Sequence, residues 1–267
     1  MKEFTVREDT TLKTFTDNYY AQASFCFRTL LKAREIRVNG ARVSADMPLK
    51  QGDIVRYFLT PKQESRAAFS VVYEDGNVIV ADKESGVNSE AVFSALCERG
   101  ETYFIHRLDR NTAGLLVFAK NAEAEGELLS AFRDRRVEKI YLARVVGCPK
   151  EKHAVCTAYL KKDAAASRVR VSSKPVGEKI ITEYEVLEGG EPSLLRVTLH
   201  TGKTHQIRAH LAFLGFPIVG DEKYGDGAYN RAHNAVRQKL VAKRLTLHCA
   251  GALAYLDGRT FLSSHEV

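Results

Sequence analysis

The chain has 267 residues, 45% hydrophobic content and a formal net charge of +7. This composition predicts one or two globular domains and argues against a disordered or fibrous chain, while the positive charge suits a polyanionic partner without requiring one. No apolar run approaches the roughly 18 residues of a membrane helix and no signal peptide opens the chain, so we expect a cytoplasmic protein with no membrane partner.

Residues 1–60 have the pattern of a small independent unit. Two amphipathic segments, Leu12–Tyr20 and Phe25–Ala33, precede two short β-rich runs. These runs flank Asn39-Gly40, the dipeptide that best supplies two positive φ angles for a type I′ turn. The pattern predicts two helices followed by a hairpin.

Basic side chains gather on the second helix and the hairpin of this unit. They are Arg28, Lys32, Arg34, Arg37 and Arg42. Such a cluster is compatible with a plain solvated face or with contacts to an RNA backbone. The charges alone slightly favour the solvated face.

Residues 61–69 lack both apolar periodicity and β-rich composition, which is typical of an interdomain linker. A larger domain, residues 70–267, then begins with two predicted strands, Val71–Tyr73 and Val78–Ala81. A helix is predicted over Ala91–Cys97.

A dense polar cluster follows and leads directly into the apolar run Leu115–Ala119. This run has no alternation and is too short for a lone helix, so it predicts a strand buried on both faces. Asp109 lies just before the strand, between Arg107 and Arg110. A carboxylate held there could act as a nucleophile, but an Asp that caps a turn and pairs with an arginine is the commoner case on physical grounds alone.

Asn121 can cap a helix whose apolar residues Leu128, Leu129 and Phe132 would face the core. A strand is predicted over Lys139–Val145. Several Val-, Ile- and Thr-rich runs then follow over residues 154–199 with no helical pattern between them. We therefore expect an α+β fold with a long mixed or antiparallel sheet flanked by helices, not a doubly wound parallel fold.

At Thr201–Leu211 the apolar period changes to that of a helix. Thr204 is the expected N-cap, and Ile207 begins the apolar stripe. Because a helix N-terminus carries free backbone N–H groups, Lys203 and His205 could hold a phosphate there together with Thr204.

A metal site is not expected. His200, His205 and His210 are five residues apart and do not share a helix face as an H-x-x-x-H pair would. The cysteines include no C-x-x-C pair and predict buried thiols. They are Cys26, Cys97, Cys148, Cys156 and Cys249.

Near the C-terminus, Arg231–Arg244 contains five basic residues and no acid. We expect this segment at the rim of an RNA groove, although a plain solvent-exposed helix is an equally good interpretation.

Three of these segments resemble motifs of the RluA-type pseudouridine synthase family. The segment from His106 matches H-R-L-D-x-x-T-x-G-L-L, Lys139–Ala143 matches K-x-Y-x-A, and Thr201–Arg208 resembles T-G-R-x-H-Q-I-R with Lys203 in place of an arginine. The loop Asp82–Val87 is similar to the family's N-K-P-x-G, with a glutamate where proline is expected. The resemblance implies an α+β fold with a long bisected sheet.

The resemblance also implies roles for individual residues. Asp109 would be the catalytic aspartate, Arg208 its ion-pair partner, Tyr141 the ring that stacks on the target base and Ile207 the floor beneath that base. Arg107 would fill the space left by the flipped nucleotide or hold a neighbouring phosphate.

The N-terminal unit resembles the αL RNA-binding domain of small-subunit ribosomal proteins. The resemblance rests on R-T-L-L-K-A-R-E-I-R-V-N-G followed by L-K-Q-G-D-I-V. It implies that Arg28, Lys32, Arg37 and Arg42 contact RNA.

The expected activity is therefore the isomerisation of uridine to pseudouridine in structured RNA, on a flipped-out base, with no cofactor and no metal. Large-subunit ribosomal RNA is the first expected substrate and transfer RNA the second, and a monomeric enzyme is expected. Two alternatives remain: a hydrolase that uses Asp109 with His205, and a non-catalytic RNA-binding factor.

Overall fold

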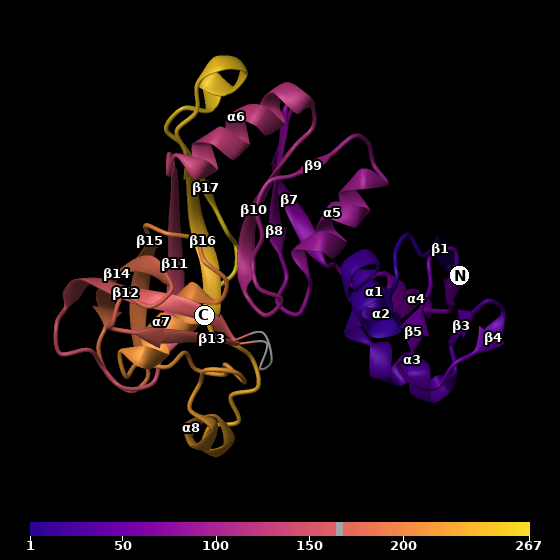
Figure 1. Cartoon of the computed structure of the whole chain (residues 1–267), viewed down its shortest axis with the longest axis horizontal. Coiled ribbons are helices and arrows are strands. Elements are labelled where there is room, and N and C mark those ends of the chain that lie inside the picture. The colour runs from indigo at the N-terminus through magenta and orange to yellow at the C-terminus, as the bar shows by residue number, and fades with distance from the viewer. Residues whose placement is uncertain (164–167) are drawn as a thin grey trace.

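The structure is a computed structural model that describes residues 1–163 and 168–267 (Figure 1). Residues 1–60 form a unit with its own four-stranded sheet, in the order β1-β6-β3-β4. Its strands are β1 (Lys2–Thr5), β3 (Ile36–Val38), β4 (Ala41–Arg42) and β6 (Ile54–Tyr57), with a separate pair β2 (Thr10–Thr11) and β5 (Pro48–Leu49). Its helices are α1 (Leu12–Tyr19), α2 (Ala21–Phe25) and α3 (Phe27–Ala33).

The predicted hairpin is present in this N-terminal unit. Asn39 and Gly40 have φ angles of 50° and 84°, which is the pair of left-handed conformations that a type I′ turn requires. The unit has a core of its own, in which the rings of Phe4, Tyr20 and Tyr57 contact one another. That the unit is an αL-type domain stays a prediction.

The segment expected as a linker, residues 61–69, is partly regular. It contains α4 (Pro61–Glu64), which begins at a capping box between Thr60 and Gln63. Ala68 is buried, and the next strand starts at Phe69. The N-terminal unit also packs against the rest of the chain, because α1 contacts α5 (Ser89–Cys97), as Figure 1 shows.

The rest of the chain is organised on an eleven-stranded sheet. Nine strands lie in the order β13-β12-β14-β15-β11-β16-β10-β8-β7, while β17 pairs with β16 and β9 with β10. In chain order the strands are β7 (Phe69–Glu74), β8 (Val78–Lys83), β9 (Tyr103–Phe104), β10 (Ala113–Ala119), β11 (Val137–Val145), β12 (His153–Asp163), β13 (Arg168–Ser172), β14 (Glu178–Glu188), β15 (Ser193–Leu199), β16 (Leu240–Leu247) and β17 (Arg259–Leu262). Only β10 and β16 pair in parallel among the described strands, so the sheet is mixed and the predicted α+β class is confirmed.

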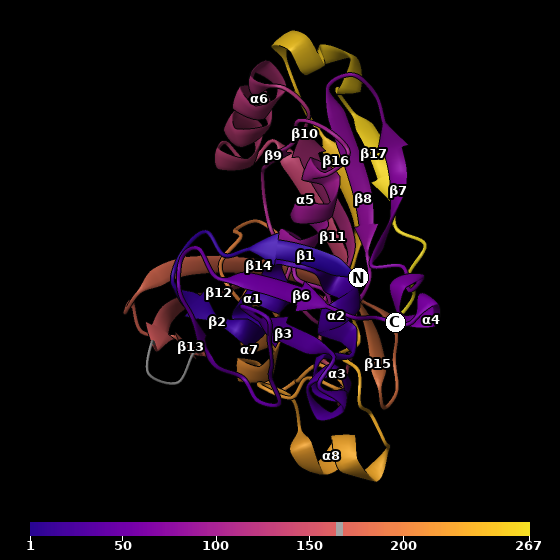
Figure 2. The same ribbon diagram turned by 90° about the vertical axis from the view of Figure 1, so that its right-hand side faces the viewer.

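Helices cover both faces of the sheet around β8 and β10, whose residues are all buried, as was predicted for the run Leu115–Ala119 of β10. On one face α5 packs against Ile79, Leu116 and their neighbours. On the other, α6 (Ala122–Arg133) and the 3-10 helix η1 (Gly251–Leu256) pack against the alternate residues of the same strands. Figure 2 shows β16 and β17 leading up to η1 at the top of the molecule.

Two predictions about side-chain burial are wrong. Asn121 caps α6 as expected, but Leu129 is 42% exposed, because the buried stripe of that helix runs through Ala124, Leu128 and Ala131. Among the cysteines expected to be buried, Cys97 and Cys148 are exposed, Cys26 and Cys156 are half-buried, and Cys249 alone is buried.

Two further helices complete the described fold, α7 (Gln206–Phe213) and α8 (Gly227–Ala232). The first six residues of α7 are buried, and Ala209 packs against β12, β13 and β14. Within the described ranges, no helix is long and apolar enough to cross a membrane.

Gly114 lies where β10 meets β16. Its φ of 115° is one that L side chains rarely adopt, and a Cβ built there would be 2.3 Å from the backbone oxygen of Ala242. The absence of a side chain at this position lets the two parallel strands approach closely, and Gly114 follows Asp109 in the chain by only a few residues.

We therefore predict that Gly114→Ala lowers the free energy of unfolding by about 2–4 kcal/mol, since it adds a steric clash to an unfavourable φ. The matched control is Gly126→Ala in α6, where a Cβ meets nothing within 4 Å. That change should stabilise the protein by about 0.5–1 kcal/mol, because alanine is the better helix former. Denaturant unfolding measures both, and equal effects of the two changes would contradict the prediction.

Candidate active site

One pocket of about 320 Å³ brings the three family-like segments together. Its volume lies in the range of small-ligand sites. The lining residues that matter here are His106, Arg107, Asp109 and Thr112 before β10, Lys139 and Tyr141 on β11, and Lys203, His205, Ile207 and Arg208 at the start of α7. The residues predicted as catalytic, Asp109, Tyr141 and Arg208, thus share a single pocket.

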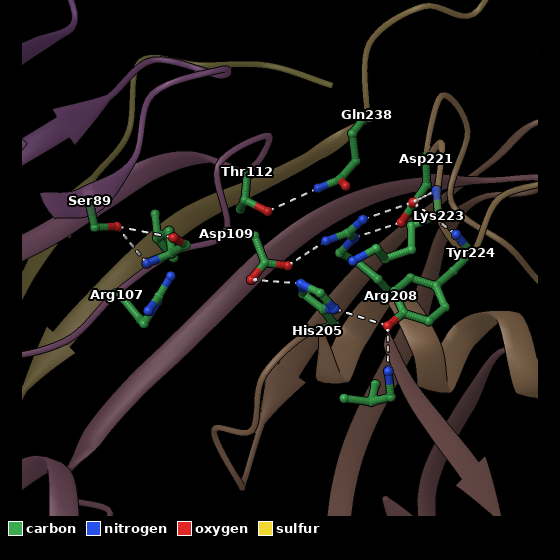
Figure 3. A network of polar contacts seen from close by, with 12 residues as sticks. Ser89, Arg107, Asp109, Thr112, His205, Arg208, Asp221, Lys223, Tyr224 and Gln238 are labelled. Carbon is green, nitrogen blue, oxygen red and sulfur yellow. Dashed lines mark hydrogen bonds and ion pairs between the residues drawn. The ribbon is translucent and has the colours of Figure 1, made fainter. Parts of the chain in front are cut away.

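Asp109 points into this pocket and binds Arg208 (Figure 3). The guanidinium Nη1 donates to Asp109 Oδ2 at 2.8 Å, and the Asp109 side chain is 22% exposed. The backbone N–H of Thr112 donates to the Asp109 backbone oxygen at 3.0 Å. The carboxylate is therefore fixed at its base by a tight turn and at its tip by the arginine, with one edge open to the pocket.

Arg208 is itself held by a second carboxylate, Asp221. Arg208 Nε donates to Asp221 Oδ2 at 2.7 Å, and Nη2 donates to Oδ1 at 2.9 Å, a bidentate pair in which the Asp221 side chain is 0% exposed. The backbone N–H groups of Lys223 and Tyr224 also donate to Asp221 Oδ1, at 2.8 and 3.0 Å. Asp221 was not predicted as a site residue, because its pairing with Arg208 depends on tertiary contacts that the local sequence does not show.

Burial works against both charges of this pair, and the hydrogen bonds outweigh it. Burial alone would raise the pKa of Asp221, but the bonds from Arg208 and from the backbone of Tyr224 and Lys223 hold that pKa below its usual value. Burial likewise would lower the pKa of Arg208, whereas Asp221 and then Asp109 raise it. The arginine is therefore a permanent cation.

His205 lies on the other side of Asp109. Its Nε2 is 4.0 Å from Asp109 Oδ1, and its Nδ1 is 2.9 Å from the hydroxyl oxygen of Tyr224. That hydroxyl oxygen also accepts a bond from the backbone N–H of Val169 at 2.9 Å. Burial lowers the pKa of His205, although the charge of Asp109 acts in the opposite direction. The lowered pKa favours a neutral ring at pH 7.

The prediction that Thr204 caps α7 is wrong. The N-cap is one residue later, at His205, which has a left-handed φ of 54°, and the helix begins at Gln206. The Gln206 side chain closes this turn, because its Oε1 accepts bonds from Thr201 and from the backbone N–H of Lys203. The Lys203 ammonium bonds to Glu178 at 2.8 Å, so it lines the pocket as half of an ion pair.

Tyr141 and Ile207 supply the apolar surface of the pocket. Tyr141 is 8% exposed and Ile207 is 4% exposed, and both line the cavity next to Asp109. Burial, followed by the charge of Asp109, raises the pKa of Tyr141, so its hydroxyl is protonated at neutral pH.

His106 is part of the protein's framework rather than of the reacting set. Its Nε2 accepts the backbone N–H of Val117 at 3.1 Å, and its ring stacks on Phe132 at 4.5 Å. Burial lowers its pKa to about 3, so the ring is neutral. These two contacts hold His106 against β10 and α6 and so help to orient the segment that carries Asp109.

Lys83 does not line the pocket but bonds to the loop that carries Asp109, a contact that sequence reasoning missed. It is 0% exposed, and its Nζ donates to the backbone oxygens of Glu84, Val87 and Arg110 at 3.0, 2.8 and 3.2 Å. Burial lowers its pKa to about 7, although the nearby charge of Asp109 opposes this. The lysine thus connects the loop after β8 to the loop that carries Asp109 by hydrogen bonds. The resemblance of the segment Asp82–Val87 to a family motif could have drawn attention to this lysine.

The two arginines beside Asp109 point away from it. Arg107 is 67% exposed at its side chain and pairs with Glu90 at 3.2 Å. Arg110 pairs with Asp17 of α1 at 2.5 Å and bonds to Ser24 of α2 at 3.0 Å. The N-terminal unit therefore contacts the loop that carries Asp109.

The other predicted RNA-binding residues lie outside the pocket. Arg28, Lys32, Arg37 and Arg42 belong to α3 and the hairpin. The basic segment Arg231–Arg244 is not one helix, because it spans the end of α8 and the start of β16.

Within that segment two cations are already engaged. The Lys243 ammonium bonds to the backbone oxygens of Ser263 and His265, and Arg244 pairs with Glu138.

Among residues 1–163 and 168–267, no cluster of His, Cys, Asp and Glu could hold a metal ion.

The geometry predicts that Arg208 is coupled more strongly to Asp221 than to Asp109. Arg208→Met leaves the fully buried Asp221 without its cation, which typically costs about 3–5 kcal/mol of stability. Asp109 is partly exposed, so water can replace part of the hydrogen bonding that it loses when the arginine is removed. Arg208→Lys keeps the charge but not the fork and should retain more stability than Arg208→Met.

Two double-mutant cycles measure this difference. Adding Asp221→Asn to Arg208→Met should recover part of the lost free energy of unfolding, and more of it than adding Asp109→Asn does. Thermal or denaturant unfolding gives all the values. Strict additivity in the first cycle would show that the buried pair does not stabilise the fold.

Comparison with known proteins agrees with the pocket. The family model described as RNA pseudouridylate synthase matches residues 77–213, a range that includes Asp109, Tyr141, Ile207 and Arg208. Ribosomal large subunit pseudouridine synthase C of Vibrio parahaemolyticus is 35% identical over 253 residues, which cover 85% of this chain and 78% of that protein.

Two further matches are informative. Ribosomal large subunit pseudouridine synthase D of Borreliella burgdorferi is 34% identical over 190 residues, 62% of this chain and 58% of that protein. The solved structure of human RNA Pseudouridylate Synthase Domain Containing 1 superposes with a TM-score of 0.59 at 27% identity, covering 68% of this chain and 81% of that one. With the family model and the long relatives in agreement, the chain belongs to the RNA pseudouridylate synthase family and is an RluA-type isomerase that acts on RNA.

Proposed function

We propose that this enzyme converts specific uridines of large-subunit ribosomal RNA to pseudouridine, with Asp109 as the nucleophile. The observation that carries the proposal is the arrangement of Asp109, Arg208 and Asp221 at the edge of a pocket lined by Tyr141 and Ile207. The ribosomal substrate is supported by the names of the relatives, which are large-subunit pseudouridine synthases.

The reaction breaks the bond between ribose C1′ and uracil N1 and forms a bond between C1′ and C5 of the same base. No atom is gained or lost, apart from the C5 proton, which leaves to solvent while N1 gains one. Asp109 can add covalently to ribose C1′ or to the uracil ring. In either route the carboxylate must be ionised and aimed, which the Arg208 bond and the turn at Thr112 support.

The target base must leave its stack to reach Asp109, which costs a few kcal/mol. Tyr141 and Ile207 would offset this cost by enclosing the ring between an aromatic and an aliphatic surface, since both are buried and line the pocket. Arg107 is exposed at the pocket mouth, where it would leave Glu90 and occupy the vacated space or bind the next phosphate.

His205 is placed beside the free edge of Asp109. We assign it to binding the nucleotide alongside Lys203, both of which line the pocket. A hydrolase that used His205 as a general acid would need a charged ring, whereas burial lowers the pKa of His205 and favours the neutral form.

The N-terminal unit would supply further RNA contacts. Arg42 and Arg56 both lie directly beside Arg37 on adjacent strands, and like charges in this position are unfavourable for the sheet itself. Glu3 pairs with Arg56, so the uncompensated charges are those of Arg37 and Arg42. Arg28, Lys32, Arg37 and Arg42 make no ion pair among the described residues. Arg42 is exposed and Arg37 is half-buried, so both can reach a phosphate, which supports the αL-type assignment.

We infer that the enzyme acts as a monomer in the cytoplasm. The support for a monomer is that the polar network around Asp109 is completed within one chain. The support for the compartment is the ribosomal RNA named for the bacterial relatives.

Asp109→Asn should abolish isomerisation while leaving RNA affinity and fold nearly unchanged. The change removes the nucleophilic charge at almost constant volume, and the amide oxygen can still accept from Arg208. We expect the rate of pseudouridine formation on ribosomal RNA transcripts to fall more than about 1000-fold. Asp134→Asn, at an exposed carboxylate on the C-cap of α6, is the control. Activity of Asp109→Asn within about tenfold of wild type would refute the role.

Replacing Arg37 and Arg42 by glutamine should weaken RNA binding without changing the pocket. Each phosphate contact that is lost lowers the slope of log affinity against log salt by about 0.7–0.9, so the double change should lower it by about 1.4–1.8. Folding stability should stay level or rise slightly, since a like-charge pair is removed.

These point changes are cleaner than deleting residues 1–60, which would also remove the Asp17 partner of Arg110. Arg7→Gln is the control, because Arg7 lies in the same unit but faces Cys97 of α5. A salt slope that is the same in all three proteins would mean that the hairpin does not contact RNA.

A further inference from the structure

A second hollow continues from the active-site pocket along the sheet. It has a volume of about 920 Å³ and is lined mainly by residues of β11, β14, β15 and β16. Lys139 and Leu199 line both cavities, so the two are joined at this point. We call the second hollow the sheet groove.

Most of the cations in the pocket and the sheet groove are already neutralised. Five of the lining Lys and Arg side chains have carboxylate partners: Arg107 with Glu90, Lys203 with Glu178, Arg208 with Asp109 and Asp221, Arg196 with Glu185, and Arg244 with Glu138. The remaining two, Lys139 and Arg135, form no ion pair with any described residue. These two therefore carry positive charge that the protein leaves uncompensated.

Lys139 is the cation at the junction. It lies on β11, two residues before Tyr141, and its ammonium lies 5.3 Å from the centre of the Phe132 ring. Burial lowers its pKa, the charge of Arg135 lowers it further, and no carboxylate opposes these effects. A half-buried ammonium next to a guanidinium is unfavourable in the free protein, and a bound anion would relieve it.

Arg135 is the exposed member of the pair. It follows the C-cap of α6 in a left-handed conformation, with a φ of 60°, where glycine or asparagine is the usual choice. It lines the sheet groove and lies close enough to Lys139 to affect its pKa. The chain thus presents two cations to the place where the pocket opens into the groove.

We infer that Lys139 and Arg135 bind the RNA phosphodiester that adjoins the flipped uridine, and that the sheet groove holds the strand beyond it. The inference rests on the proposed function, because it takes the base to be in the pocket beside Asp109. A nucleotide in that pocket keeps its two phosphodiester links, and each must emerge where the pocket opens. Arg107 lies at the mouth of the pocket, and the Lys139 pair lies where it joins the groove.

Salt-dependent RNA binding tests this inference. The probe is a labelled RNA stem–loop transcript with one loop uridine, and the proteins carry Asp109→Asn so that no turnover occurs during the titration. Lys139→Gln and Arg135→Gln should each lower the salt slope by about 0.7–0.9, and the double variant by about 1.4–1.8. Lys139→Arg keeps the charge and should keep the slope.

Two controls separate a phosphate contact from a general effect. Lys150→Gln removes an exposed lysine that lines neither cavity and should leave the slope unchanged. Thermal unfolding should show no loss of stability for Lys139→Gln, since the lysine has no carboxylate partner to strand. Arg135→Gln alters an exposed side chain and keeps the test valid if the Lys139 variant folds poorly.

Turnover with the native Asp109 provides the second measurement. Lys139→Gln should raise KM more than it lowers kcat, because the contact is made in both the bound complex and the transition state. Unchanged slopes for Lys139→Gln and Arg135→Gln would overturn the inference while leaving the proposed function intact. Absence of pseudouridine with the unmodified enzyme would instead refute the proposed function, and the binding slopes would still report on the groove.

Discussion

One buried arginine, Arg208, connects the fold to the chemistry. Two of its nitrogens bind the fully buried Asp221, and the third binds Asp109 at the edge of the pocket. A guanidinium can serve both carboxylates at once because its donors are arranged in a rigid planar fork, which a lysine lacks. The inner pair fixes the position and charge of the arginine, and the arginine in turn aims the proposed nucleophile.

The rest of the site depends on segments that are distant in sequence and meet around this arginine. Asp109 precedes β10, Tyr141 lies on β11, and Arg208 is in α7. The close approach of β10 to β16 at Gly114, and the buried Lys83 that binds three backbone oxygens, hold the loop of Asp109 in place. Electrostatic preorganisation of this kind is set by the fold before any RNA binds.

Local patterns predicted much of this architecture. The buried run Leu115–Ala119, the Asn39-Gly40 turn and the cap at Asn121 are specified by short-range rules, and the structure has all three. The family-like motifs placed Asp109, Tyr141 and Arg208 in one pocket, which composition and periodicity alone could not do.

What the sequence did not predict depends on tertiary contacts. Asp221 and Lys83 are charged residues whose burial requires partners elsewhere in the fold, so periodicity and composition did not predict that they are buried. The start of α7 was misplaced because the side chain of Gln206 and a left-handed His205 replace an ordinary cap at Thr204. The exposed Leu129 shows the same limit, since the buried stripe of α6 follows small alanines as well as leucines.

The most direct test of the account is to map pseudouridines across the cellular RNA of the source organism with and without this protein, and with Asp109→Asn in its place. Particular uridines of large-subunit ribosomal RNA should lose the modification both when the protein is absent and when Asp109 is replaced. Loss confined to transfer RNA would contradict the ribosomal substrate. A full modification pattern in the Asp109→Asn cells would contradict the claim that this carboxylate carries the reaction.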